Sequence, residues 1–164
     1  MKNTIIALSL ITLIQPALAR VVEITAYKQG EASLKEASMV VFDIDNTLLR
    51  PVQTLGSDQW FGSREQYWVK AGRTKEEAVE HAIKEWSEVQ ELTKVQITDP
   101  VLPSLIASLR NRGIPVMALT ARPLTLVKAS LRQLKSIGID FSQSGPSRMD
   151  INPKAENPAL YTNG

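Results

Sequence analysis

The chain has 164 residues, which is enough for one domain or for one domain with a small insert. Its 43% hydrophobic and 22% charged residues exclude a disordered chain. The net charge is +2, and basic residues are interleaved with acidic ones, as in Lys75-Glu76-Glu77. This pattern excludes a continuous basic surface that could follow a phosphate backbone, and therefore excludes nucleic acid as a partner. The absence of cysteine excludes disulfides, thiolate metal sites and cysteine nucleophiles.

Residues 1–19 have the pattern of a secretory signal peptide. Lys2 supplies the positively charged n-region, residues 4–14 are almost wholly apolar, and Ala17-Leu18-Ala19 matches the A-x-A pattern of a cleavage site. The apolar run is too short for a membrane-spanning helix. We expect cleavage before Arg20 and a periplasmic or secreted protein that is no longer bound to the membrane. An uncleaved N-terminal anchor is the alternative.

The first half of the mature domain, residues 20–164, is predicted to form one strand and a helical excursion. A short helix is expected at 32–37 and a strand at 38–43, buried on both faces because its residues are continuously apolar. Thr74 and Glu77 form a capping box for a helix over 75–93. Its inner face is expected along Val79, Ile83, Trp86 and either Val89 or Gln90. A shorter helix is expected at 64–71.

The second half alternates helices and strands. Asp99-Pro100 predicts a helix start, followed by a buried stripe at Leu102, Leu105, Ile106 and Leu109. The remaining expected elements are a strand at 114–119, a helix at 124–137 with Leu124, Val127, Leu131 and Leu134 inward, and a strand at 139–141. Residues from 142 onward have a loop composition. Such alternation predicts an α/β fold with a parallel sheet and right-handed crossovers.

Asp43 and Asp45 follow the first strand directly, in the order Asp43-Ile44-Asp45-Asn46-Thr47. Ligands of open α/β sheets sit at the carboxyl ends of the strands. Two neighbouring carboxylates repel each other, so a cation is expected to compensate them. The pattern favours a Mg²⁺ site in which one carboxylate can act as a nucleophile. The alternative is an ordinary turn after the strand, which Asp and Asn also favour.

Thr120 and Arg122 follow the strand at 114–119 in the same way. A hydroxyl beside a helix N-terminus makes an anion site, although Thr is also a common N-cap. Arg122 either adds a charged donor to a phosphate or forms a salt bridge at the start of the helix.

The stretch Asp43 to Leu48 resembles motif I of the haloacid dehalogenase (HAD) superfamily, and Leu119-Thr120-Ala121-Arg122 resembles motif II. The resemblance covers residues 38–164. Within it, the stretch Asp43 to Leu48 and residues 55–61 are similar to an exported bacterial branch of the superfamily that has no assigned substrate. It implies a HAD-like Rossmannoid parallel sheet, with a core at 38–47 and 95–164 and a helical cap inserted at 48–94.

The resemblance also implies a Mg²⁺-dependent phosphatase that forms an aspartyl-phosphate on a phosphorylated small molecule. Asp43 would attack phosphorus, and Asp45 would protonate the leaving group and then activate water. Thr120, with Arg122, would hold the phosphate, and Asp43 and Asp45 would bind the metal. Trp60, Tyr67 and Trp68 of the cap either line a substrate pocket or pack the cap.

The sequence departs from the family pattern at its end. The family needs a later Lys and an acidic pair, and the chain shows no later apolar strand followed by such a pair; Lys154 lies in a Pro/Asn-rich stretch. We therefore expect a truncated sheet, with the first strand as its edge, and an inactive or impaired enzyme. The alternative is an exported, non-enzymatic binding or interaction protein on the same scaffold. The sequence does not indicate an oligomeric state.

Overall fold

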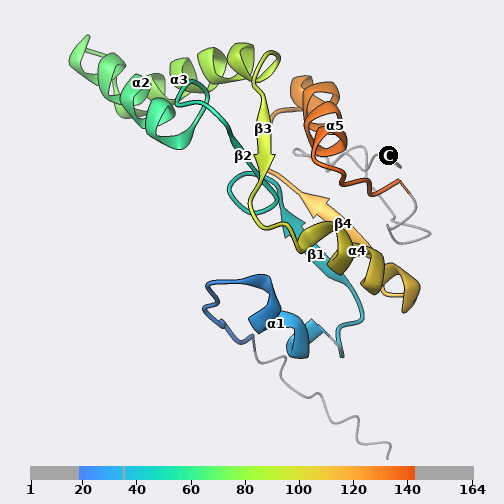
Figure 1. The fold of residues 1–164 in the computed structure, drawn as a ribbon. Helices are drawn as coiled ribbons and strands as arrows, with labels where there is room; N and C mark the ends of the chain where they lie inside the picture. Colours follow the sequence, from blue (N-terminus) through green and yellow to red (C-terminus); the bar gives the residue numbers. More distant parts are fainter. Residues whose placement is uncertain (1–18, 35, 143–164) are drawn as a thin grey trace, which may run out of the picture.

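The fold is an α/β arrangement that combines a small parallel sheet with helices (Figure 1). The computed structural model describes residues 19–34 and 36–142. The helices are α1 (Tyr27–Leu34), α2 (Asp58–Lys70), α3 (Lys75–Gln90), α4 (Leu102–Asn111), the 3₁₀ turn η1 (Leu124–Leu126) and α5 (Val127–Ser136). The strands are β1 (Val40–Asp43), β2 (Leu49–Pro51), β3 (Val95–Ile97) and β4 (Val116–Leu119).

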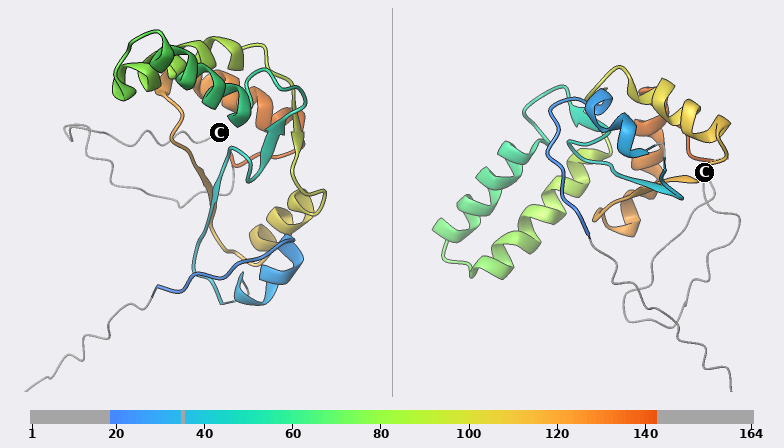
Figure 2. Two further views of the ribbon diagram at one scale, coloured as in Figure 1. Left: turned by 90° about the vertical axis from the view of Figure 1, so that its left-hand side faces the viewer. Right: turned by 90° about the horizontal axis from the view of Figure 1, so that it is seen from below.

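Two strand pairs organise the described residues. β1 pairs in parallel with β4, with Val40 opposite Val116 and Asp43 opposite Leu119. β2 pairs antiparallel with β3, with Leu49 opposite Ile97. In this second pair, β2 leads from the sheet to α2, and β3 leads back from α3. Figures 1 and 2 accordingly show the two helices side by side at one end of the molecule and α1 at the other.

The core lies between the parallel strands and α4. Val40, Phe42 and Val116 contribute from the strands, and Leu102, Ile106 and Leu109 contribute one face of α4. The predicted stripe on α4 is therefore confirmed, with Leu105 packed at its margin. Tyr27 of α1 closes one side of this core, with its ring 6.1 Å from that of Phe42.

β1 is buried on one face only, so the expectation of burial on both faces is wrong. Val40 and Phe42 are buried, whereas Val41 is 44% exposed. Among the described residues β1 has a single strand neighbour, β4, and α4 covers one face of the pair. The alternation is that of a half-covered strand.

Several predicted helices and strands differ from the observed ones. The first helix lies at 27–34 rather than 32–37, and α2 begins at Asp58 rather than near 64 because Ser57 caps it there by accepting from the Trp60 N–H. Residues 139–141 form no strand, although Ile139 is buried in the core. Of the residues predicted to face inward in the helix at 124–137, Leu134 is buried, whereas Leu124 and Leu131 are exposed. α5 also buries Ala129, Ser130 and Gln133.

Candidate functional site

Parallel pairing of β1 and β4 brings the two sequence motifs to one edge of the sheet. Because Asp43 is opposite Leu119, the residues that follow each strand emerge side by side. Asp43 and Asp45 therefore lie close to Thr120 and Arg122, although more than seventy residues separate them in the sequence.

These motif residues line a cavity of about 420 Å³, which we call the strand-end pocket. The sheet side is formed by Asp43, Asp45, Asn46, Thr120, Ala121, Arg122 and Pro123. The side toward the α2–α3 pair is formed by Asp58, Phe61, Ile83 and Trp86. All four predicted site residues thus share one pocket.

Arg122 holds both oxygens of Asp45. Its Nε lies 2.8 Å from Oδ2 of Asp45 and its Nη2 lies 2.6 Å from Oδ1, which is the bidentate geometry of a strong ion pair. The Arg122 side chain is 3% exposed, and its Nη1 donates to Ser130 and Gln133 at 3.0 and 2.7 Å. Arg122 thus forms a salt bridge, although its partner is Asp45 after β1 rather than a residue at the start of the helix.

Asp43 lies at the exposed end of β1 and accepts a hydrogen bond of 3.3 Å from the Thr47 hydroxyl. The turn between them contains Asn46 with a φ of 58°, a left-handed conformation that Asn tolerates well. This turn aims the Asn46 amide at Asp58, to which it donates at 2.6 Å. The motif turn is therefore linked directly to the first residue of α2.

Thr120 is not the N-cap of the following helix. Its hydroxyl oxygen accepts from the backbone N–H of Arg122 at 3.1 Å, whereas Pro123 precedes η1 without any side-chain cap bond. The hydroxyl hydrogen of Thr120 can rotate, so the group can still donate into the pocket. This hydrogen bond shapes the loop that presents Arg122 to Asp45.

The aromatic residues of the helix pair divide into two groups. Trp68 of α2 stacks on His81 of α3 with ring centroids 4.2 Å apart, which joins the two helices. Tyr67 packs edge-on against Trp68 within α2. Phe61 and Trp86 line the pocket instead. Of the aromatics singled out from the sequence, Trp60, Tyr67 and Trp68, none lines the pocket, and helical spacing could not indicate that Phe61 does.

The formal charges of the groups that line the pocket do not cancel. Asp43, Asp45 and Asp58 contribute three carboxylates and Arg122 contributes one guanidinium, which leaves two negative charges. The pKa of Tyr27 is raised, first by burial of the phenol and then by the nearby carboxylates of Asp99 and Asp43. No group of three or more potential His, Cys, Asp or Glu ligands is found within residues 19–34 and 36–142.

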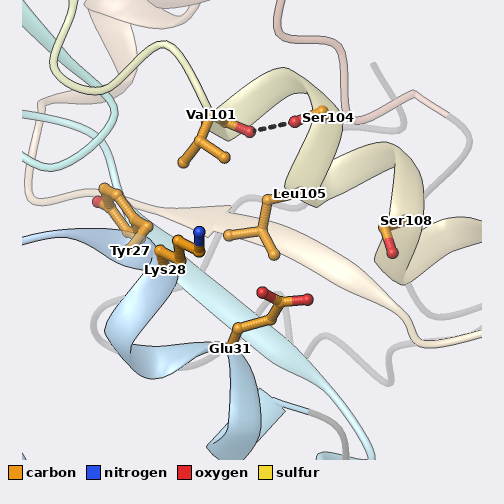
Figure 3. A pocket seen from close by; sticks show the side chains of 7 residues that line it. All are labelled: Tyr27, Lys28, Glu31, Val101, Ser104, Leu105 and Ser108. Atoms are coloured by element: carbon orange, nitrogen blue, oxygen red, sulfur yellow. Dashed lines mark hydrogen bonds between the residues drawn. The ribbon is translucent and has the colours of Figure 1, made fainter.

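A second cavity, of about 320 Å³, lies between α1 and α4 (Figure 3). Tyr27, Lys28 and Glu31 face Val101, Ser104, Leu105 and Ser108 across it. The Ser104 hydroxyl donates to the Val101 carbonyl at 2.8 Å, as the dashed line shows. None of the residues expected to carry chemistry lies there.

A family model described as "Protein of unknown function (DUF2608)" matches residues 17–164. The chain belongs to this family. Two proteins of Chlamydia pneumoniae, each named "Putative outer membrane protein", are 30% identical over 127 residues and 29% identical over 130 residues. These alignments cover 77% and 79% of this chain but 46% and 48% of the relatives, so the chain spans about half the length of the curated relatives it matches.

A protein of Chlamydia trachomatis with the same name is 25% identical over 105 residues, covering 64% of this chain and 40% of the relative. No solved structure matches the chain. Within the described residues of this DUF2608 protein, every helix is too short or too polar to cross a membrane.

Proposed function

We propose that the strand-end pocket binds the phosphoryl group of a small phosphate monoester and belongs to a HAD-type phosphatase. One observation carries the proposal: the β1–β4 register gathers Asp43, Asp45, Thr120 and Arg122 at one sheet edge, beneath a helix pair inserted between them. An ordinary turn after a strand does not require a hydroxyl and a guanidinium from a distant strand end.

The proposed chemistry begins at Asp43, the more exposed of the two carboxylates. One of its oxygens would form a bond to phosphorus while the bond from phosphorus to the leaving alcohol breaks. Asp45 would give a proton to that alcohol and later take one from the water that releases phosphate. For this role, one oxygen of Asp45 must first separate from Arg122, since both are paired in the structure.

The residues present fit a magnesium ion in charge and donor type. Mg²⁺ prefers oxygen ligands and keeps several of its waters, so it does not require a cage of three carboxylates. The Asp43 carboxylate and the backbone carbonyl of Asp45 would hold it, because Arg122 occupies the carboxylate of Asp45. The ion would offset the two excess negative charges, which otherwise repel a phosphate ester.

Calorimetric titration with orthophosphate, with and without Mg²⁺, tests the proposal. We expect binding with Mg²⁺ and none in chelator, because the uncompensated pocket repels the anion. Hydrolysis of p-nitrophenyl phosphate that depends on Mg²⁺ is the stronger result. Absence of phosphate binding in both conditions contradicts the proposal.

A second candidate is the binding of an organic cation without turnover. Its support is the same excess of negative charge next to Phe61 and Trp86, since carboxylates and aromatic faces together recognise ammonium groups. Binding of a quaternary ammonium compound by the metal-free protein, without phosphate binding in Mg²⁺, would favour this candidate over the phosphatase.

We also propose that the protein acts outside the cytoplasm. The names of the relatives point to the cell envelope, and the family match begins at residue 17, close to the expected cleavage site. The predicted signal peptide lies almost wholly outside the described residues. Mass spectrometry of the protein from a bacterial envelope fraction should find Arg20 at the N-terminus; an intact Met1 in the cytosol contradicts export.

A further inference from the structure

The Gln133 side chain joins the strand-end pocket to the base of the α2–α3 pair. It is 2% exposed, and both ends of its amide are engaged. Its Oε1 accepts from Nη1 of Arg122 at 2.7 Å. Its Nε2 donates to the backbone carbonyls of Gln90 and Thr93, each at 3.2 Å, and to Oε1 of Gln90 at 3.1 Å.

The orientation of this amide is fixed by its neighbours. Guanidinium nitrogens only donate and backbone carbonyls only accept. A rotated amide would place its NH₂ group against Arg122 and its oxygen against the carbonyls of Gln90 and Thr93. Gln133 therefore fits its surroundings in one orientation only.

Gln90 extends the link to the point where the chain enters the helix pair. It is 1% exposed, and its Nε2 donates to the Gly56 carbonyl at 2.9 Å. The Trp86 indole donates to the same carbonyl at 2.9 Å. Gly56 precedes α2, and Gln90 ends α3, so both connections between sheet and helix pair meet on one side chain.

We infer that Gln133 is a positioning residue for the proposed phosphatase: it holds the Arg122 fork against Asp45 and couples that ion pair to the base of the helix pair. A shift of α2 and α3 that breaks the contact between Gln90 and Gln133 changes the position of the Arg122 guanidinium. That change in turn alters how firmly Asp45 is held and how readily it can transfer a proton. This inference deepens the proposed function and rests on it only for the role of Asp45.

The test is ¹⁵N NMR of the Arg122 Nε–H group, which reports its bond to Asp45 without requiring a ligand. In Gln133→Glu the side chain keeps an acceptor for Arg122 but presents a charged oxygen to the carbonyls of Gln90 and Thr93. We expect a displaced Nε–H signal and about tenfold weaker binding of p-nitrophenyl phosphate in Mg²⁺, since a buried polar contact is lost. Gln133→Leu should displace the signal as well.

Ser130→Ala is the matched control, because it removes the other Nη1 partner without touching Gln90. Its Nε–H signal and affinity should stay close to those of the wild type. If Gln133 serves only to stabilise the fold, its folded variants should have lower thermal midpoints and an unchanged Arg122 Nε–H signal. That result would overturn the inference. If Gln133→Leu does not fold, the Gln133→Glu signal decides.

The two proposals can fail separately. If the wild type binds neither orthophosphate nor p-nitrophenyl phosphate, the proposed function fails, whereas a displaced Arg122 signal in Gln133→Glu still supports the positioning role. If the wild type binds both and Gln133→Glu matches it in signal and affinity, the positioning role fails alone.

Discussion

At the scale of single residues, the geometry of Arg122 explains why lysine could not replace it. Its planar fork reaches Asp45 with two nitrogens and Ser130 and Gln133 with a third. A lysine ammonium keeps the charge but cannot match two carboxylate oxygens and two further acceptors at once.

Arg122→Lys should therefore lower the free energy of unfolding by about 1–3 kcal/mol, the range for buried polar groups left without partners. Arg73→Lys is the control, because Arg73 is exposed in the connection between α2 and α3, and its change should stay within about 0.5 kcal/mol. Urea denaturation measures both. Equal effects of the two variants would contradict the role of Arg122 as the centre of the buried contacts.

Gly56 offers a second residue-scale prediction, with Gly72 as its matched control. Both have positive φ, 81° and 88°, so Ala at either position costs conformational energy of about 1 kcal/mol. A Cβ on Gly56 would also lie 2.9 Å from Oγ1 of Thr93 and 3.0 Å from Nε2 of Gln90, whereas nothing lies within 4 Å at Gly72.

We expect Gly56→Ala to destabilise the protein by about 2–3 kcal/mol in denaturant titrations, and Gly72→Ala by about 1 kcal/mol. The difference measures the close packing at the base of the helix pair. An effect at Gly72 as large as that at Gly56 would show that backbone strain alone is responsible.

At the scale of elements, α2 and α3 are joined by a charged contact. Arg64 of α2 donates two hydrogen bonds to Glu85 of α3, and Trp68 donates a third at 3.1 Å. The hydrogen bond from Arg64 is the main reason that the pKa of Glu85 is lowered. A carboxyl group with a lowered pKa stabilises the folded state above its ordinary pKa, and this contribution is lost as the pH falls through the lowered value.

Glu85→Gln should accordingly lower the thermal midpoint at pH 7 by about 1–3 °C, as expected for a partly exposed ion pair. The two midpoints should converge as the pH falls through the lowered pKa of Glu85, because the wild-type carboxylate then becomes protonated. Differential scanning calorimetry from pH 7 downward makes the comparison. A difference that persists at low pH would assign the effect to packing rather than to charge.

Helix positions could be predicted well where a local signal exists. The capping box of Thr74 and Glu77 gave the start of α3, and the structure shows both of its hydrogen bonds. The inner face of α3 was predicted less well: Ile83 is 41% exposed, and the buried Ala78 and Ala82 were not predicted. Gln90, the alternative to Val89, is buried. Spacing alone did not decide between the two, because the burial of a glutamine depends on partners from distant segments.

At the scale of the whole molecule, the site was predictable because parallel strands present their carboxyl ends together. The order of residues after β1 and β4 sufficed to place Asp43, Asp45, Thr120 and Arg122 in one region. The contribution of the helix pair was not predictable, because the position of Phe61 at the pocket depends on tertiary packing of α2 and not on a local sequence signal.

Phe61 should contribute to recognition of the organic part of a substrate. Phe61→Ala is expected to weaken binding of p-nitrophenyl phosphate in Mg²⁺ about tenfold, from the loss of aromatic contact area, and to leave orthophosphate binding unchanged. Tyr67→Ala, on the same helix but outside the pocket, should change neither. Calorimetry with both ligands compares them. Equal loss for both ligands would mean that Phe61 shapes the phosphate site instead.

The central claim is that Asp43 is the nucleophile of a phosphoryl-transfer site, and the variant Asp43→Asn tests it most directly. The measurement is the rate of p-nitrophenyl phosphate hydrolysis and the thermal midpoint of wild type and variant, with and without Mg²⁺. Because the sequence departs from the family pattern after Arg122 and an impaired enzyme is expected, we predict weak Mg²⁺-dependent turnover in the wild type and none in the variant. Because removing one of several crowded carboxylates relieves repulsion, the metal-free midpoint should be equal or slightly higher. Turnover that survives in Asp43→Asn would contradict the claim.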